Sequence, residues 1–128
     1  MKNYTQVYVQ NSLEAVEHYC DAFGAEVTFE IKNPAQDAYE HCELSVKGEP
    51  FLAAAETPAP YDVGLIHREK WQVMTFNAFE MGSEEAVRHA FQVLSQGGVV
   101  IAPIGELPWS TCCATVIDRY GVCWWLSI

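Results

Sequence analysis

Residues 12–24 read SLEAVEHYCDAFG, and a similar stretch, SEEAVRHAFQVLSQGG, occupies residues 83–98. When Ser12 is aligned with Ser83, five of the first seven positions are identical, and the apolar residues that follow stay in phase. Apolar residues three and four positions apart are typical of an amphipathic helix. The two stretches therefore predict two similar helices, 71 residues apart, in a chain with two similar halves.

Segments with alternating apolar and polar residues, or with β-branched runs, surround each predicted helix and predict strands. In the first half the helix covers residues 12–23, and strands cover residues 4–10, 27–31, 39–47 and 51–56. In the second half the helix covers residues 83–96, strands cover residues 71–81, 99–104, 112–117 and 122–128, and residues 105–111 form a loop. The predicted order of elements is β-α-β-β-β, twice.

The two halves belong to one predicted domain of 128 residues, a length that allows a substantial hydrophobic core. Module one covers residues 1–57 and module two covers residues 71–128. Residues 58–70 lack periodicity and contain proline, glycine and charged residues, which favours a connection between the modules.

Charge and cysteine content narrow the classes of function. The chain has 17 acidic residues against 7 Lys plus Arg, a net charge of −10, and so lacks the basic surface that binds nucleic acid or anionic membranes. No apolar run is long enough to cross a bilayer, and residues 1–10 lack the apolar centre of a signal peptide. The five cysteines form no CxxC motif and favour buried free thiols over disulfides or a zinc site. We expect a cytoplasmic protein.

Several short motifs, in a particular order and spacing, carry a family resemblance. They are YCDAFGAE at residues 19–26, HCEL at residues 41–44 with Gly48, ETP at residues 56–58, Gly97-Gly98, Trp109, and DRYGVCW at residues 118–124. This arrangement resembles the vicinal oxygen chelate superfamily, which includes glyoxalase I, ring-cleaving dioxygenases and antibiotic-binding resistance proteins. Within it, the chain is most similar to PhnB-like proteins.

The resemblance implies an α+β fold, the glyoxalase/bleomycin resistance fold. In that fold, two β-α-β-β-β modules form an open mixed sheet that encloses a cavity, and the helices lie outside. The resemblance also implies a homodimer. Metal-using relatives direct four ligands to a divalent ion, and the corresponding positions fall near Tyr4, Ala54 and Ala78 and at Trp125. None is a good ligand. A shift of two residues would bring in Glu56 and Glu80, but two carboxylates alone make a poor closed site. We therefore expect no metal and no other cofactor.

The mixed faces of the predicted strands have the composition of a ligand pocket, with a few polar groups among aromatic side chains. The candidate ligand-binding residues are Gln6, Tyr8, His41, Glu43, Glu56, Trp109 and Trp125. His41 and Glu43 lie two residues apart on one strand face. This spacing fits either an acid–base pair or ligand contact, or a half-exposed polar strand face with no catalytic role. Trp124 lies on the apolar face of its strand and is expected in the core.

Two further pairs of residues have a structural interpretation. His18 and His89 occupy matched positions on the polar sides of the two predicted helices, where we expect them to be solvated. Cys112 and Cys113 are adjacent, so alternation places one on each sheet face, where we expect packed thiols.

We expect a metal-independent, PhnB-like protein that binds an unidentified small molecule in an aromatic-lined cavity, with catalysis left open. One alternative is a divalent-metal-dependent lyase, isomerase or dioxygenase that uses Glu56, Glu80 and His41. A second is a non-enzymatic protein that sequesters a drug-like molecule. A third is a structural dimer whose cavity is filled by its own side chains. The sequence does not name the ligand or the reaction.

Overall fold

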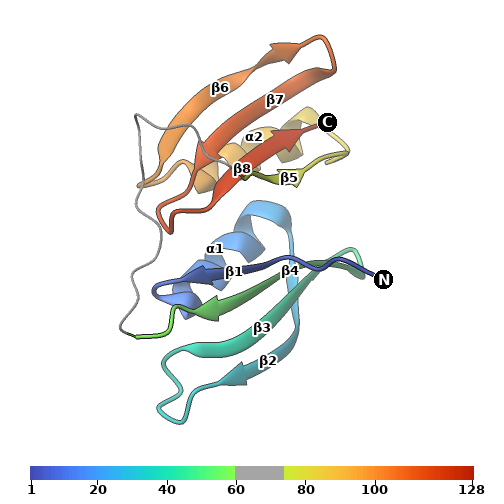
Figure 1. The fold of residues 1–128 in the computed structure, drawn as a ribbon. Coiled ribbons are helices and arrows are strands. Elements are labelled where there is room, and N and C mark those ends of the chain that lie inside the picture. Colours follow the sequence, from blue (N-terminus) through green and yellow to red (C-terminus); the bar gives the residue numbers. More distant parts are fainter. Residues whose placement is uncertain (60–73) are drawn as a thin grey trace. The chain divides into compact units, whose positions relative to one another are not determined.

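The computed structural model describes residues 1–59 and 74–128, and each of these two parts forms a compact unit (Figure 1). Each described part contains one helix and one four-stranded sheet, in the order β-α-β-β-β. The predicted pair of similar modules is confirmed. Most of the predicted connection, together with residues 71–73 of the predicted strand, lies outside the described residues.

Module one consists of β1 (Gln6–Val9), α1 (Ser12–Phe23), β2 (Glu26–Lys32), β3 (Tyr39–Val46) and β4 (Glu49–Glu56). Its strands lie in the order β1-β4-β3-β2. β1 is parallel to β4, and the other pairs are antiparallel. The helix has the predicted bounds, while β1 begins two residues later than predicted and β4 begins two residues earlier.

Module two repeats this topology with β5 (Phe76–Ala78), α2 (Glu84–Leu94), β6 (Val99–Leu107), β7 (Ser110–Ile117) and β8 (Cys123–Ser127), in the order β5-β8-β7-β6. The predicted loop at residues 105–111 is wrong, because β6 continues to Leu107 and only a short turn precedes β7. Pro103 does not stop β6, since β6 is an edge strand whose pairing with β7 is irregular between Ala102 and Gly105.

The core of module one lies between α1 and one face of its sheet. Val16 and Tyr19 of α1 are buried, as are Cys42 and Leu44 of β3. His18 is also buried, so its predicted solvation is wrong, because the buried side of α1 is wider than its apolar residues indicate. His89 of α2 is exposed, as predicted. Within residues 1–59 and 74–128, no helix has both the length and the apolar character needed to cross a membrane.

Asp118 organises the turn between β7 and β8. Its buried carboxylate accepts hydrogen bonds from the backbone N–H groups of Tyr120 (2.9 Å) and Val122 (3.0 Å) and from the indole N–H of Trp124 (2.9 Å). These three donors compensate for the loss of water around a buried charge. The predicted core position of Trp124 is confirmed. The motif at residues 118–124 therefore has a structural role.

Gly98 allows the segment after α2 to pass close to the end of β7. A Cβ atom at this position would lie 2.2 Å from the backbone oxygen of Ile117, so any larger residue would force the two segments apart. The preceding Gly97 has a φ of 70°, a left-handed conformation that glycine adopts without steric cost. Gly97 and Gly98 thus have a structural role in the connection between α2 and β6.

Glu56, at the end of β4, holds the N-terminus of α1. Its carboxylate oxygens accept the backbone N–H groups of Asn11 (3.1 Å) and Ser12 (2.9 Å). Asn11 has a φ of 58° and makes no side-chain cap, so Glu56 is the acceptor that satisfies backbone N–H groups at the start of α1. In module two, the side chain of Ser83 caps α2 by accepting the backbone N–H of Ala86 (3.1 Å).

Replacing Glu56 with alanine should lower the free energy of unfolding by about 1–2 kcal/mol, because two helix N–H groups lose their acceptor. Chemical denaturation of the purified protein measures this change. Glu49→Ala, which removes an exposed carboxylate from the same strand, is the matched control and should change stability by less than about 0.5 kcal/mol. Equal effects of the two substitutions would contradict the capping role.

Candidate ligand-binding face of module one

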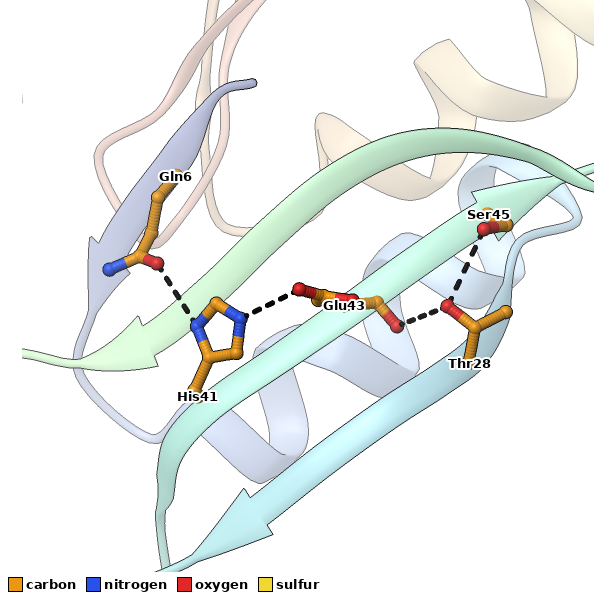
Figure 2. Close-up of polar contacts among 5 residues, drawn as sticks. All are labelled: Gln6, Thr28, His41, Glu43 and Ser45. Atoms are coloured by element: carbon orange, nitrogen blue, oxygen red, sulfur yellow. Dashed lines mark hydrogen bonds and ion pairs between the residues drawn. The ribbon is translucent and has the colours of Figure 1, made fainter. Parts of the chain in front are cut away.

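Strand pairing places several candidate residues on the sheet face of module one that α1 does not cover. Gln6 of β1 pairs with Ala53 of β4, Ala53 pairs with Glu43 of β3, and Glu43 pairs with Phe29 of β2. Because paired residues share a sheet face, these four side chains form a row across the sheet. In Figure 2, Gln6 and Glu43 lie in front of the sheet, and α1 lies behind it. We refer to this side as the uncovered face.

A second row lies beside the first. Tyr8 pairs with Ala55, two residues along from Gln6 and Ala53, and His41 pairs with Ile31, two residues along from Glu43 and Phe29. Since side chains two positions apart in a strand point to the same side, this row also lies on the uncovered face. Four predicted site residues, Gln6, Tyr8, His41 and Glu43, therefore share one face.

Three of these residues form a hydrogen-bonded network. The Nδ1 atom of His41 lies 3.1 Å from Oε1 of Gln6, and its Nε2 atom lies 3.0 Å from Oε1 of Glu43 (Figure 2). The side chains of His41 and Glu43 are 33% and 40% exposed. We call this group the His41 network (Gln6, His41 and Glu43). It joins β1 to β3 and stays open to solvent.

The His41 network crosses a strand. β4 lies between β1 and β3, so these two strands are about 9–10 Å apart. Gln6 and His41 can meet over β4 because its residues on this face are Ala53 and Ala55, whose methyl groups leave room above the strand. The small side chains of Ala53 and Ala55 therefore allow a contact between β1 and β3 across β4.

The two neighbours of His41 differ in the hydrogen bonds that they can make. A carboxylate only accepts, so Nε2 of His41 donates to Glu43. The side-chain amide of Gln6 can accept from Nδ1 through its oxygen or donate to Nδ1 through its N–H. His41 therefore links an acceptor on β3 to a side chain on β1 that can either accept or donate.

Further contacts hold Glu43 and place Tyr4 near it. The hydroxyl of Thr28 donates to the backbone oxygen of Glu43 at 3.3 Å and lies 3.4 Å from the hydroxyl of Ser45, which ties β2 to β3 where their pairing is irregular (Figure 2). Burial raises the pKa of Tyr4, and the negative charges of Glu43 and Cys42 raise it further. The charge of Glu43 is therefore felt by an aromatic residue just before β1.

Large apolar and aromatic side chains surround the His41 network and remain accessible. Tyr4, Tyr8, Phe29 and Ile31 are between 42% and 54% exposed. The ring centroid of Phe29 lies 6.1 Å from that of His41. Exposed apolar side chains gathered around ordered polar groups are typical of a binding surface.

Comparison with known proteins identifies the family. The model of the Glyoxalase/Bleomycin resistance protein/Dioxygenase superfamily matches residues 3–126. The chain belongs to this superfamily. The predicted resemblance is confirmed, and so is the α+β fold with two β-α-β-β-β modules. No curated protein matches the chain.

Solved structures of this superfamily's fold cover nearly the whole chain. A PhnB protein from Bacillus cereus has a TM-score of 0.73 and 21% identity, over 99% of this chain and 98% of that one. A protein from Pseudomonas aeruginosa has a TM-score of 0.70 and 21% identity, over 99% and 96%. The fosfomycin resistance protein FosX from Listeria monocytogenes, solved as a mutant with Mn(II) and a dihydroxypropylphosphonic acid, has a TM-score of 0.62 and 10% identity, over 99% and 90%. At these identities, the likeness shows the fold alone.

The strand register locates the positions that the resemblance places near Ala54 and Ala78. Ala54 pairs with Val7, and Ala78 pairs with Leu126, and all four side chains are buried. The positions on the other face of the sheets are Gln6 with Ala53 in module one and Asn77 with Trp125 in module two. Ala53 and Trp125 are therefore equivalent positions of the two modules.

These residues do not fit a metal centre of the superfamily type. The side chains at these positions are the amides of Gln6 and Asn77, the methyl group of Ala53 and the indole of Trp125. None of them is a carboxylate, imidazole or thiolate ligand. Both oxygens of Glu56 are engaged by the N-terminus of α1, and among the residues that the structure describes no three His, Cys, Asp or Glu side chains lie close enough to hold an ion. The expectation of metal independence rests on this donor set and stays a prediction.

Of the remaining candidate residues, Glu56 holds the start of α1, and Trp109 and Trp125 belong to the other module. Trp109 is 72% exposed in the turn between β6 and β7, and Trp125 is half-buried on β8. Both belong to module two, and their part in ligand binding stays a prediction, as does that of Glu56. Sequence alternation indicated that His41 and Glu43 are neighbours, but nothing in the sequence paired Gln6 with His41 or Glu56 with the start of α1.

The cysteines are free thiols, and burial accounts for their properties. Cys42, Cys112, Cys113 and Cys123 are buried, and Cys20 is half-buried. Burial, with a smaller contribution from the charge of Glu30, raises the pKa of Cys42 to about 11. Burial also raises the pKa of Cys20, Cys112 and Cys123. The predicted packing of Cys112 and Cys113 is confirmed.

The raised pKa of Cys42 should make this thiol slow to react in the folded protein, because only the thiolate attacks disulfide reagents. We expect Ellman's reagent at pH 7.5 to modify Cys20 before the four buried cysteines, and the rate at Cys42 to increase as the pH rises toward 11. Mass spectrometry of digested protein locates the modified residues, and urea-unfolded protein is the control. Fast modification of Cys42 in the folded protein would contradict its burial.

Replacing Ala53 with leucine should separate Gln6 from His41, because the larger side chain occupies the space above β4. Nitrogen-15 NMR of the imidazole reports the tautomer and hydrogen bonding of His41. We expect Ala53→Leu to give the same change as Gln6→Ala, which removes the same contact without added volume. An unchanged His41 spectrum in both variants would show that the contact across β4 is absent.

Proposed function

We propose that this superfamily member binds a small organic molecule, without a metal ion, on the uncovered face of module one. The observation that carries the proposal is the contact between Gln6 and His41 across β4, which extends through His41 to Glu43. Polar side chains on an exposed sheet face rarely need to be ordered across three strands for stability, since exposed ion pairs contribute only about 0–1 kcal/mol.

The His41 network leaves two groups available to a ligand. Among the described residues, neither the amide nitrogen of Gln6 nor the second carboxylate oxygen of Glu43 has a further hydrogen-bond partner. Tyr8, Phe29 and Ile31 add accessible apolar surface beside these polar groups. A few oriented polar groups within an apolar frame are the usual components of a small-molecule site.

Binding is better supported than catalysis by His41. Both ring nitrogens already have partners, so His41 would have to release Gln6 or Glu43 before it could take a proton from a substrate. A non-enzymatic role, such as sequestration of a drug-like molecule, needs no such change. The metal-dependent alternative lacks a suitable set of ligands, because the paired residues at the corresponding positions are Gln6 with Ala53 and Asn77 with Trp125.

We further propose that the protein acts in the cytoplasm as a homodimer. The free thiols support a reducing compartment, where disulfides are rare. The net charge of −10 supports the absence of nucleic-acid and anionic-membrane partners. Light scattering after size-exclusion chromatography would give the mass in solution, and a mass of one chain would overturn the dimer.

A small-molecule library screened by thermal shift and ligand-observed NMR should contain compounds that bind wild-type protein and lose about tenfold or more in affinity in His41→Ala, because His41 no longer holds the ligand-binding groups of Gln6 and Glu43 in place. His89→Ala, an exposed histidine of α2, is the matched control and should leave binding unchanged. Compounds that bind both variants equally would place the ligand elsewhere. A screen without hits would favour a structural protein.

A further inference from the structure

Residues 1–59 carry a strong excess of negative charge. Residues 1–59 contain ten acidic residues and three lysines, with no arginine. Glu43 lies on the uncovered face, and the ion-pair partner that the structure gives it among the described residues is His41, which is charged only when protonated. Within residues 1–59 and 74–128, no lysine or arginine forms an ion pair with the carboxylate that a ligand meets on this face.

Three accessible aromatic rings lie around that carboxylate. Phe29 is the direct cross-strand neighbour of Glu43, Tyr4 is close enough to sense its charge, and Tyr8 lies on the same face of β1. All three are more than 40% exposed. A carboxylate with aromatic faces beside it is the combination that attracts organic cations, through charge pairing and through the negative faces of the rings.

We infer that the ligand of this site is an organic cation with a flat, apolar body, such as an aromatic amine or amidine, bound to Glu43 on the face that Phe29, Tyr4 and Tyr8 line. This inference rests on the proposed function and specifies its ligand. An anion is disfavoured because it would lie beside the Glu43 carboxylate, and both nitrogens of His41 already face Gln6 and Glu43. A neutral ligand would leave the free oxygen of Glu43 without a charged partner.

Benzamidine, benzamide and benzoate test the inference, because they have nearly the same shape and carry a positive charge, no charge and a negative charge. Titration of each into nitrogen-15-labelled full-length protein, followed by amide chemical shifts, gives the site and the affinity. We expect benzamidine to shift the amides of Gln6, Phe29 and Glu43, with an affinity at least tenfold higher than that of either analogue. Added salt should weaken benzamidine binding.

Two substitutions separate charge from shape. Glu43→Gln keeps an acceptor for His41 and should make benzamidine bind no better than benzamide. Glu49→Gln removes an exposed carboxylate from the hairpin end of β4 and should leave the preference intact, so it controls for the overall acidity of the chain. Phe29→Leu should weaken benzamidine about two- to fivefold, which is the loss of a cation–π contact at an exposed site.

The possible results distinguish the inference from the proposed function. Equal binding of the three compounds at Gln6, Phe29 and Glu43 would overturn the cation preference while leaving a ligand site on this face. Benzamidine shifts confined to other residues would overturn both, whereas a preference for benzamidine over benzamide that survives in Glu43→Gln would overturn the cation inference and leave the ligand site. A charge preference that Glu43→Gln abolishes and Glu49→Gln retains would support both.

Discussion

The position of β4 between β1 and β3 is the constraint on which module one depends. Because residues alternate between faces, the register of β1 on β4 decides which side chains enter the core and which stay uncovered. A slip by one residue would turn Gln6 toward α1 and expose Val7. Backbone hydrogen bonds from Ala53 to Thr5 and from Thr57 to Val9 hold this register at both ends of β1. The pairing of β1 with β4 thus determines both which residues form the core and which form the His41 network.

Local patterns in the sequence predict the fold well because each helix and most strands have periodic apolar residues. The helix repeat indicates both modules, and α1 has the predicted bounds. The strand ends are less predictable, since Pro103 is tolerated on an edge strand that a single sequence does not identify as one. The sequence likewise assigns a position only near Ala54, because three consecutive alanines show no alternation from which a face could be assigned.

The candidate site is predictable only in part. The spacing of His41 and Glu43 within one strand indicates that they are neighbours, but the contact with Gln6 depends on a strand order that joins residues 35 positions apart. The cap provided by Glu56 acts across 44 and 45 positions and has no local signal except the weak capping context of Asn11. His18 was misjudged because the polar side of a short helix can still be covered by its surroundings.

The equivalent positions Ala53 and Trp125 show what a duplicated topology permits. Each module completes its own ladder of backbone hydrogen bonds, so the side chain at this position can change in one copy while the other copy keeps its shape. One copy has the smallest chiral side chain there and the other has the largest of all side chains. Duplication thus gives a single chain two independently adjustable surfaces, and a new specificity could arise through a few substitutions in one half without a change in the fold.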